Sequence, residues 1–148
     1  MAVNTLPLSF GKVESYTKEI STARSGETAI SSPSAGTDLA ELFTAGTYGG
    51  GYDTIEYQVC ISSGTPTQAA AKILIWETDT SGANARIVRQ IQVSAGSAQG
   101  TTVAGQNAII TFNRADLKAG VKVFASVTVV TTNCIWNLTI RAGQFEAQ

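Results

Sequence analysis

The chain has 148 residues, of which 43% are hydrophobic and only 14% are charged, and its formal net charge is -1. Globular proteins carry about 25% charged residues, so this surface is poor in charge, as in a protein packed against other protein or equally in a rigid secreted β-module. No basic stripe marks a nucleic-acid footprint, no apolar run reaches the roughly 18 residues that cross a bilayer, and no signal peptide is recognisable, so we expect a soluble product made in the cytoplasm.

Residues 1–26 differ from the rest of the chain, because they are polar, weakly patterned and comparatively rich in charge. They nevertheless carry more apolar side chains than a solvated tail needs: Leu6, Leu8, Phe10, Val13, Tyr16 and Ile20. A disordered tail is one interpretation, and an arm that docks on a neighbouring surface is the preferred one. We predict an N-terminal arm over residues 1–26, with partner contacts through Leu6, Leu8, Phe10 and Tyr16, and a β-sandwich domain over residues 27–148.

Short runs of alternating apolar residues fill the chain from about residue 27 to residue 145, with turns rich in Gly, Ser, Thr and Asn between them. This pattern of runs and turns predicts strands at 27–32, 53–62, 71–77, 86–93, 107–113, 121–131 and 135–145. Residues 37–44 form either one helical turn or an irregular strand. Residues 71–77 are apolar on both faces, so we expect a central strand that is covered on both sides, by the chain itself or by a partner.

Connections of mixed length separate these strands, among them the long stretch 94–106 and a corner at 114–120. Mixed lengths favour a jelly-roll or Greek-key order over a simple meander. We therefore predict an all-β fold, an antiparallel sandwich of about eight strands. The three glycines at 49–51 are expected to interrupt regular structure, which leaves Tyr48 and Tyr52 beside them as candidates for surface contact with a partner.

The polar residues offer no clear chemistry. Asp38, Glu41, Asp53 and Glu56 would have to converge in a sugar cleft to act as glycosidase carboxylates, and nothing in the sequence indicates that they do. The loop at 79–84 carries one carboxylate, whereas calcium loops supply several, so a hairpin turn is the better interpretation. We predict that the protein is not an enzyme and has no catalytic, metal-binding or cofactor-binding residue.

The tryptophans and cysteines have structural interpretations. Trp76 and Trp136 are in phase with apolar neighbours, which favours core packing over a carbohydrate platform. Cys60 and Cys134 are expected to be buried, reduced thiols, because a disulfide fits a cytoplasmic product poorly.

Three segments carry a resemblance to a known group of proteins. The first contains "DLAELFTAG", the second "LKAGVKVFASV" and the third ends in "AGQF". The matching residues are Asp38, Leu39, Leu42, Phe43, Ala45, Gly46, Leu117, Ala119, Gly120, Phe124, Ala125, Ser126, Val127, Gly143 and Phe145. Over residues 37–146 the chain resembles small structural proteins of tailed bacteriophages, of the kind that decorate capsids.

The resemblance implies a jelly-roll decoration, or cement, protein that sits on the capsid exterior of a virion and stabilises the shell. Its implied partners are the major capsid protein and copies of itself, as a homotrimer; no nucleic acid and no membrane are expected. The apolar surplus on strand 71–77 also favours self-association. The alternative function is a carbohydrate-binding jelly-roll module of a phage tail or host-adhesion apparatus.

Overall fold

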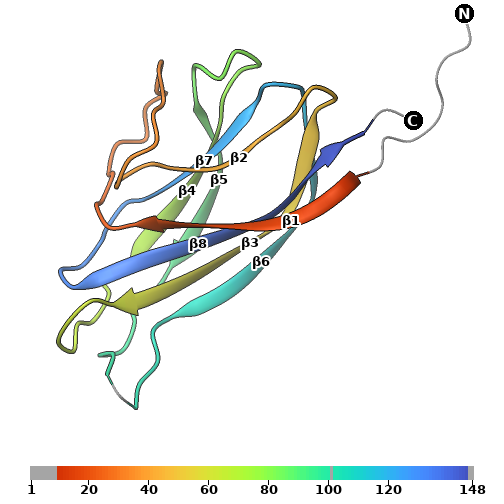
Figure 1. The fold of residues 1–148 in the computed structure, drawn as a ribbon. Coiled ribbons are helices and arrows are strands. Elements are labelled where there is room, and N and C mark those ends of the chain that lie inside the picture. The colour runs from red at the N-terminus through yellow and green to blue at the C-terminus, as the bar shows by residue number, and fades with distance from the viewer. Residues whose placement is uncertain (1–9, 101, 147–148) are drawn as a thin grey trace, which may run out of the picture.

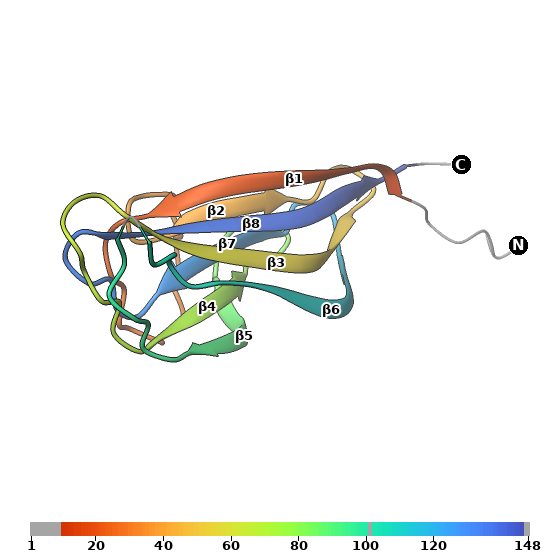
Figure 2. The ribbon, with the colours of Figure 1, turned by 90° about the horizontal axis from the view of Figure 1, so that it is seen from below.

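Eight strands make up the fold of residues 10–100 and 102–146, which are the residues that the computed structural model describes (Figure 1). They are β1 (Phe10–Ile20), β2 (Ala40–Thr44), β3 (Gly50–Ile61), β4 (Ala71–Glu77), β5 (Arg86–Val93), β6 (Asn107–Leu117), β7 (Lys122–Val127) and β8 (Cys134–Phe145). Sheet I has the order β1-β8-β3-β6 and sheet II the order β2-β7-β4-β5. Figure 2 shows the two sheets as facing layers. The prediction of an all-β sandwich is confirmed.

The strand pairs are nested about one hairpin. β4 pairs with β5, β3 with β6, β2 with β7 and β1 with β8, all antiparallel. Alternate pairs belong to opposite sheets, and the β3–β8 and β4–β7 ladders join the pairs within each sheet. A long hairpin folded over in this way is a jelly roll, as the mixed connection lengths predicted.

The main core lies between the sheets. Ile55, Leu138 and Ile140 of sheet I face Ile73, Ile75 and Val123 of sheet II, and all six side chains are fully buried. Burying a large apolar side chain contributes about 1.5–3 kcal/mol. Alternation along β8 and along β3 from Ile55 to Val59 therefore fixes which face of sheet I points inward.

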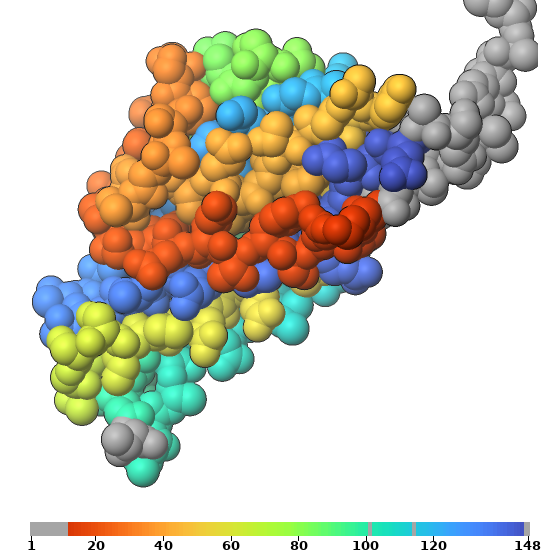
Figure 3. Space-filling model, viewed as in Figure 1, coloured from red at the N-terminus to blue at the C-terminus, as the bar shows by residue number. Residues whose placement is uncertain are grey.

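A second core lies on the outer face of sheet II, which is covered by residues 21–39 of the same chain. Leu74, Trp76 and Phe124 point outward from β4 and β7 and are buried together with Leu39 and Ala85. Ile30 exchanges backbone hydrogen bonds with Ala85 (N–H to O distances 3.0 and 2.8 Å), and Arg24 N donates to the Val127 carbonyl at 2.9 Å. Orange atoms of this segment are prominent at the upper left of Figure 3. The expectation that strand 71–77 is covered on both sides is confirmed, and the cover comes from the chain itself.

The structure corrects the predicted arm. Residues 10–20 form β1, which pairs with β8 from Phe10↔Phe145 to Ile20↔Trp136, and Ile20 is fully buried. These residues therefore belong to the sandwich, whose boundary does not lie at residue 27. β1 is an edge strand, and charges on an edge strand discourage unwanted pairing; the same charges give it the sequence character of a solvated arm. Leu6 and Leu8 lie outside the described residues.

Three further local expectations are corrected, and one open alternative is resolved as a strand. Residues 27–32 form only an isolated bridge at Ile30, residues 37–44 contain the strand β2, and the strand predicted at 107–113 continues to Leu117. Gly50 and Gly51 lie inside β3 rather than interrupting it. A Cβ at Gly50 would lie 2.7 Å from the Gly143 carbonyl oxygen, so glycine is required there by the close approach of β8.

Candidate partner-binding surface

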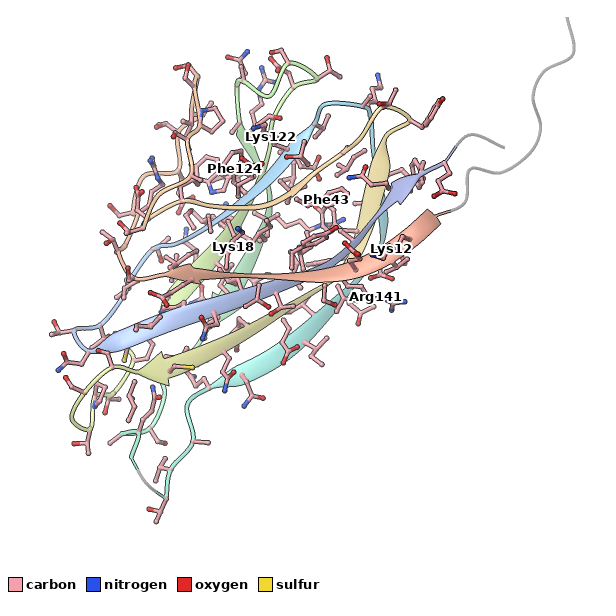
Figure 4. The ribbon with its side chains drawn as sticks, viewed as in Figure 1. Lys12, Lys18, Phe43, Lys122, Phe124 and Arg141 are labelled. Carbon is pink, nitrogen blue, oxygen red and sulfur yellow. The ribbon has the colours of Figure 1, made fainter. Side chains whose placement is uncertain are left out.

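Tyr16, a predicted contact residue, lies in a hollow between the two edge strands β1 and β2. The hollow has a volume of about 270 Å³ and is also lined by Lys18, residues 41–44 and Gln144. The Tyr16 ring packs against Phe43, with 6.0 Å between ring centroids, and its hydroxyl donates to Glu14 Oε2 at 2.6 Å. This hydrogen bond raises the pKa of Tyr16. Figure 4 shows Phe43 and Lys18 beside this gap.

Tyr48 is the predicted contact residue that the structure leaves most accessible. Its side chain is 56% exposed, and it lies in the turn between β2 and β3. Backbone hydrogen bonds hold the turn, from Gly49 N to the Gly46 carbonyl at 2.9 Å and from Phe145 N to the Gly49 carbonyl at 3.1 Å. An exposed tyrosine on a turn that is already ordered loses little entropy when a protein partner binds it.

Phe10 lies at the same end of the sandwich as this turn. Its backbone pairs with Phe145 at the end of β8, and Phe145 also bonds to the Tyr48 turn. Gln144 ties the region to β2, because its Nε2 donates to the Thr44 carbonyl at 2.8 Å and its Oε1 accepts from Gly46 N. Two of the predicted contact residues, Phe10 and Tyr48, thus belong to one hydrogen-bonded end of the molecule.

Tyr52 is not on the surface, which corrects its selection as a contact residue. It is fully buried, and its hydroxyl donates to Glu77 Oε1 at 2.8 Å. Burial, followed by the charge of Glu77, raises the pKa of Tyr52 well above its usual range. The register shift between Tyr52 and Thr54 changes the alternation at this point, so that Tyr52 and Ile55 both face inward.

The carboxylates considered for catalysis do not form a cluster. Three of them pair with separate cations, in the ion pairs Arg24 Nε–Asp38 Oδ2 (3.1 Å), Lys122 Nζ–Glu41 Oε2 (3.3 Å) and Arg141 NH1–Asp53 Oδ2 (3.7 Å). Figure 4 shows Lys122 and Arg141 well apart. Within residues 10–100 and 102–146, no three His, Cys, Asp or Glu side chains gather where they could hold a metal.

The loop at 79–84 is the hairpin turn between β4 and β5, as predicted. The Asp79 carboxylate accepts hydrogen bonds from Ser81 N (2.9 Å), Ser81 Oγ (2.6 Å), Ala83 N (3.0 Å) and Asn84 Nδ2 (2.7 Å). The bonds from Ser81 and Asn84 are the main cause of the lowered pKa of Asp79. Because both carboxylate oxygens hold the turn together, their role here is structural.

Both tryptophans are fully buried, which confirms their core interpretation. Trp76 Nε1 donates to Ser126 Oγ at 2.9 Å, and Trp136 Nε1 donates to Gln68 Oε1 at 3.2 Å. A carbohydrate platform would need exposed rings, so the alternative function loses its best residues. Cys60 and Cys134 are free thiols, and burial raises the pKa of Cys134.

The outer face of sheet I is a surface that the sequence analysis did not identify. In register across β1, β8, β3 and β6 lie Thr17, Thr139, Glu56 and Ile109, and beside them Ser15, Arg141, Thr54 and Thr111. These side chains are exposed or half-exposed. The sequence does show polar residues at every second position of these strands, which indicates an exposed face. Only the sheet order shows that the polar residues of the four strands lie side by side.

Comparison with known proteins gives distant likenesses. No family model and no curated protein matches the chain. Among solved structures, the chain is similar to Eiger TNF from S. frugiperda, with 16% identity over 68% of this chain and 64% of that chain and a TM-score of 0.31. It is similar to a nora virus structure, with 12% identity over 100% of this chain and 66% of that chain and a TM-score of 0.34. It is also similar to the VP2 subviral particle of infectious bursal disease virus, with 14% identity over 95% of this chain and 37% of that chain and a TM-score of 0.31. The chain spans less than two thirds of each of these proteins. Likenesses this weak assign no function.

No helix in the described part of the chain is long and apolar enough to span a membrane.

Proposed function

We propose that the protein is a non-enzymatic structural component of a virion. The observation that carries the proposal is the resemblance over residues 37–146, now placed on the fold. Its motif residues include Leu39, Leu42, Phe124 and Val127, all of which are buried. The motifs therefore describe how a jelly roll packs, and the shared property is an architecture rather than a chemical site.

The more specific proposal is a decoration protein on the head exterior that binds the major capsid protein. Such a protein acts through contact area, and many modest contacts repeated by symmetry add up through avidity. The outer face of sheet I and the Tyr48 turn are the surfaces that suit this role, because the first extends across all four strands of the sheet and the second presents an exposed aromatic anchor.

A homotrimer remains part of the proposal on the resemblance alone. The argument from a surplus apolar face no longer supports it, since residues 21–39 cover that face. A threefold arrangement on the shell then depends on contacts with the capsid as well as on contacts between copies.

The test compares heads assembled with and without this chain. We expect heads that lack it to release their DNA at a lower temperature, and added purified protein to restore the resistance. Tyr48→Ala should bind heads more weakly, whereas Val88→Ala, at an exposed site on β5, should bind like the wild type. Equal heat resistance with and without the chain would reject the decoration role.

A further inference from the structure

β6 is an edge strand whose first part, residues 107–111, lacks the usual protection, whereas a register shift leaves residues 112–114 unpaired with β3 and Arg114 and Asp116 carry charge. It pairs only with β3, and edge strands normally carry charges or prolines, or are short. The other edges follow this rule, with Lys12, Glu14, Lys18 and Glu19 on β1, Arg86 and Arg89 on β5, and only five residues in β2. Residues 107–113 of β6, with the sequence NAIITFN, contain neither a charge nor a proline.

The backbone of β6 offers a free row of hydrogen-bonding groups. Val59 N donates to the Gln106 carbonyl at 2.8 Å, directly beside the Gln58↔Asn107 pair of the β3–β6 register. Hydrogen-bonded and non-hydrogen-bonded pairs alternate in an antiparallel ladder, so Ala108 and Ile110 bond to β3. The N–H and C=O groups of Ile109 and Thr111 therefore point away from β3, toward the open edge.

This edge presents Ile109 among the polar Asn107, Thr111 and Asn113 on its outer face, and apolar side chains on its inner face, where Arg89 lies over the Phe112 ring at 4.3 Å from the centroid. Ile109 is 65% exposed, the largest value among the exposed large hydrophobic residues of the described chain. On the inner face, Ala108, Ile110 and Phe112 pack against the main core but are only partly buried. Exposed apolar side chains beside unpaired backbone groups are the features that another strand would cover.

We propose that β6 pairs antiparallel with β6 of a second copy of this chain, across a twofold axis at Ile110. In this register Ile109 lies opposite Thr111 of the second copy, and both present backbone groups at the edge. The regular pairing is centred on residues 109–111, because the register shift against β3 begins at Phe112, which would lie opposite the small Ala108. A twofold axis brings like residues near one another, so the uncharged stretch avoids the repulsion that a charge near the axis would cause.

A second copy fits this edge better than it fits β1. On β1, the charges of Lys12, Glu14, Lys18 and Glu19 discourage edge pairing. The β6 pairing joins two copies of sheet I into one continuous sheet. It does not depend on the proposed virion role, and as a twofold contact it is separate from the threefold arrangement.

Sedimentation velocity of the full chain at micromolar concentrations tests the pairing. We expect a dimer for the wild type and at least about tenfold weaker association for Ile109→Lys, which places two added charges at the joined edge. Val88→Lys is the matched control, because Val88 is an exposed residue (44%) on the edge strand β5, and it should remain dimeric. Thr111→Pro should also dissociate the dimer, because it removes an edge N–H without removing a bond to β3.

Circular dichroism of each variant establishes that the fold is kept. A monomeric wild type would overturn the proposal, as would a dimer or trimer that survives both Ile109→Lys and Thr111→Pro. Loss of association in Val88→Lys to the same extent would also overturn it, because the effect would then not be specific to β6.

Cross-linking tests the register. Ile110 would face its own copy at a non-hydrogen-bonded pair, where Cβ atoms lie about 4.5–5.5 Å apart, close to disulfide distance. We expect oxidised Ile110→Cys to run as a covalent dimer on non-reducing gels, and Val88→Cys and the wild type to run as monomers. An Ile110→Cys protein that associates without cross-linking would overturn the register centred on Ile110.

Discussion

The two outer faces of the sandwich differ, because one is apolar and buried under another segment of the chain, whereas the other is largely polar and exposed. The outer face of sheet II carries Leu74, Trp76 and Phe124 and is buried under residues 21–39. The outer face of sheet I carries Thr17, Thr139 and Glu56 in register, and these side chains stay exposed or half-exposed among the residues that the structure describes. A sheet in a sandwich needs only one apolar face, so the second apolar face of sheet II obliges the chain to supply another layer.

This difference gives the two outer faces different roles, one in the stability of the fold and the other in binding. The covered face contributes buried apolar area to the fold, whereas the bare face contributes little to folding and is left available for contact. Substitutions on the two faces should therefore differ strongly in their effect on the free energy of unfolding, and the following predictions test that contrast.

Trp76→Ala should have the largest effect. Trp76 is fully buried under residues 21–39, and removing a buried Trp side chain lowers the free energy of unfolding by about 3–5 kcal/mol. Denaturant unfolding followed by circular dichroism measures the loss, with Thr54→Ala on the bare face as the control. A loss below about 1 kcal/mol would mean that residues 21–39 cover the face only loosely.

Ser126→Ala should cost less, about 1–3 kcal/mol, because it leaves the buried Trp76 N–H without its acceptor at 2.9 Å. The same substitution in a Trp76→Phe background should be nearly neutral, since the donor is then absent. A double-mutant cycle by denaturant unfolding gives the coupling energy. Equal costs in the two backgrounds would show that Ser126 acts through packing alone.

Between the two faces, Tyr52 should make stability depend on alkaline pH. Burial raises its pKa in the folded chain above the usual value of about 10, so the protonated hydroxyl favours folding below about pH 10. This contribution should be lost as the pH rises from about 10 toward the raised pKa. Tyr52→Phe should cost about 1 kcal/mol at neutral pH and lack this part of the pH dependence. Parallel curves for the two proteins from pH 9 to 11 would contradict the prediction.

Thr139→Ala should have the smallest effect. Its Oγ1 lies 2.8 Å from Thr17 Oγ1 at an exposed site on the bare face, and surface substitutions of this kind change stability by about 0.5 kcal/mol or less. Thermal unfolding measures the change. A loss comparable to that of Ser126→Ala would show that the outer face of sheet I also contributes to the fold.

Periodicity predicted the architecture well, because inward-facing residues must repeat every second position. The strands at 53–62, 71–77 and 86–93 lie close to β3, β4 and β5, and the double apolar character of 71–77 correctly indicated a cover on both sides. What the pattern could not provide was the identity of that cover, since residues 21–39 bind through a few contacts that are distant in sequence, such as Ile30 with Ala85.

The contact residues were harder to predict, for two physical reasons. A single register shift beside Asp53 changed the phase of β3 and turned Tyr52 inward. The pairing of β1 with β8 depends on residues at opposite ends of the described chain, and no local pattern reports such a contact. Tyr48, in contrast, was correctly placed at the surface, because the glycines around it form a turn.

The position of β8 in the middle of sheet I has a consequence for synthesis on the ribosome. Sheet I cannot close until β8 emerges, because β8 lies between β1 and β3, and β1 must wait without a partner while the strands between them are made. Sheet II needs nothing later than β7, and its cover, residues 21–39, is translated before most of it. Long-range pairings form slowly, so we expect sheet II and its cover to assemble on the nascent chain, and β1 to be the last strand to find its place.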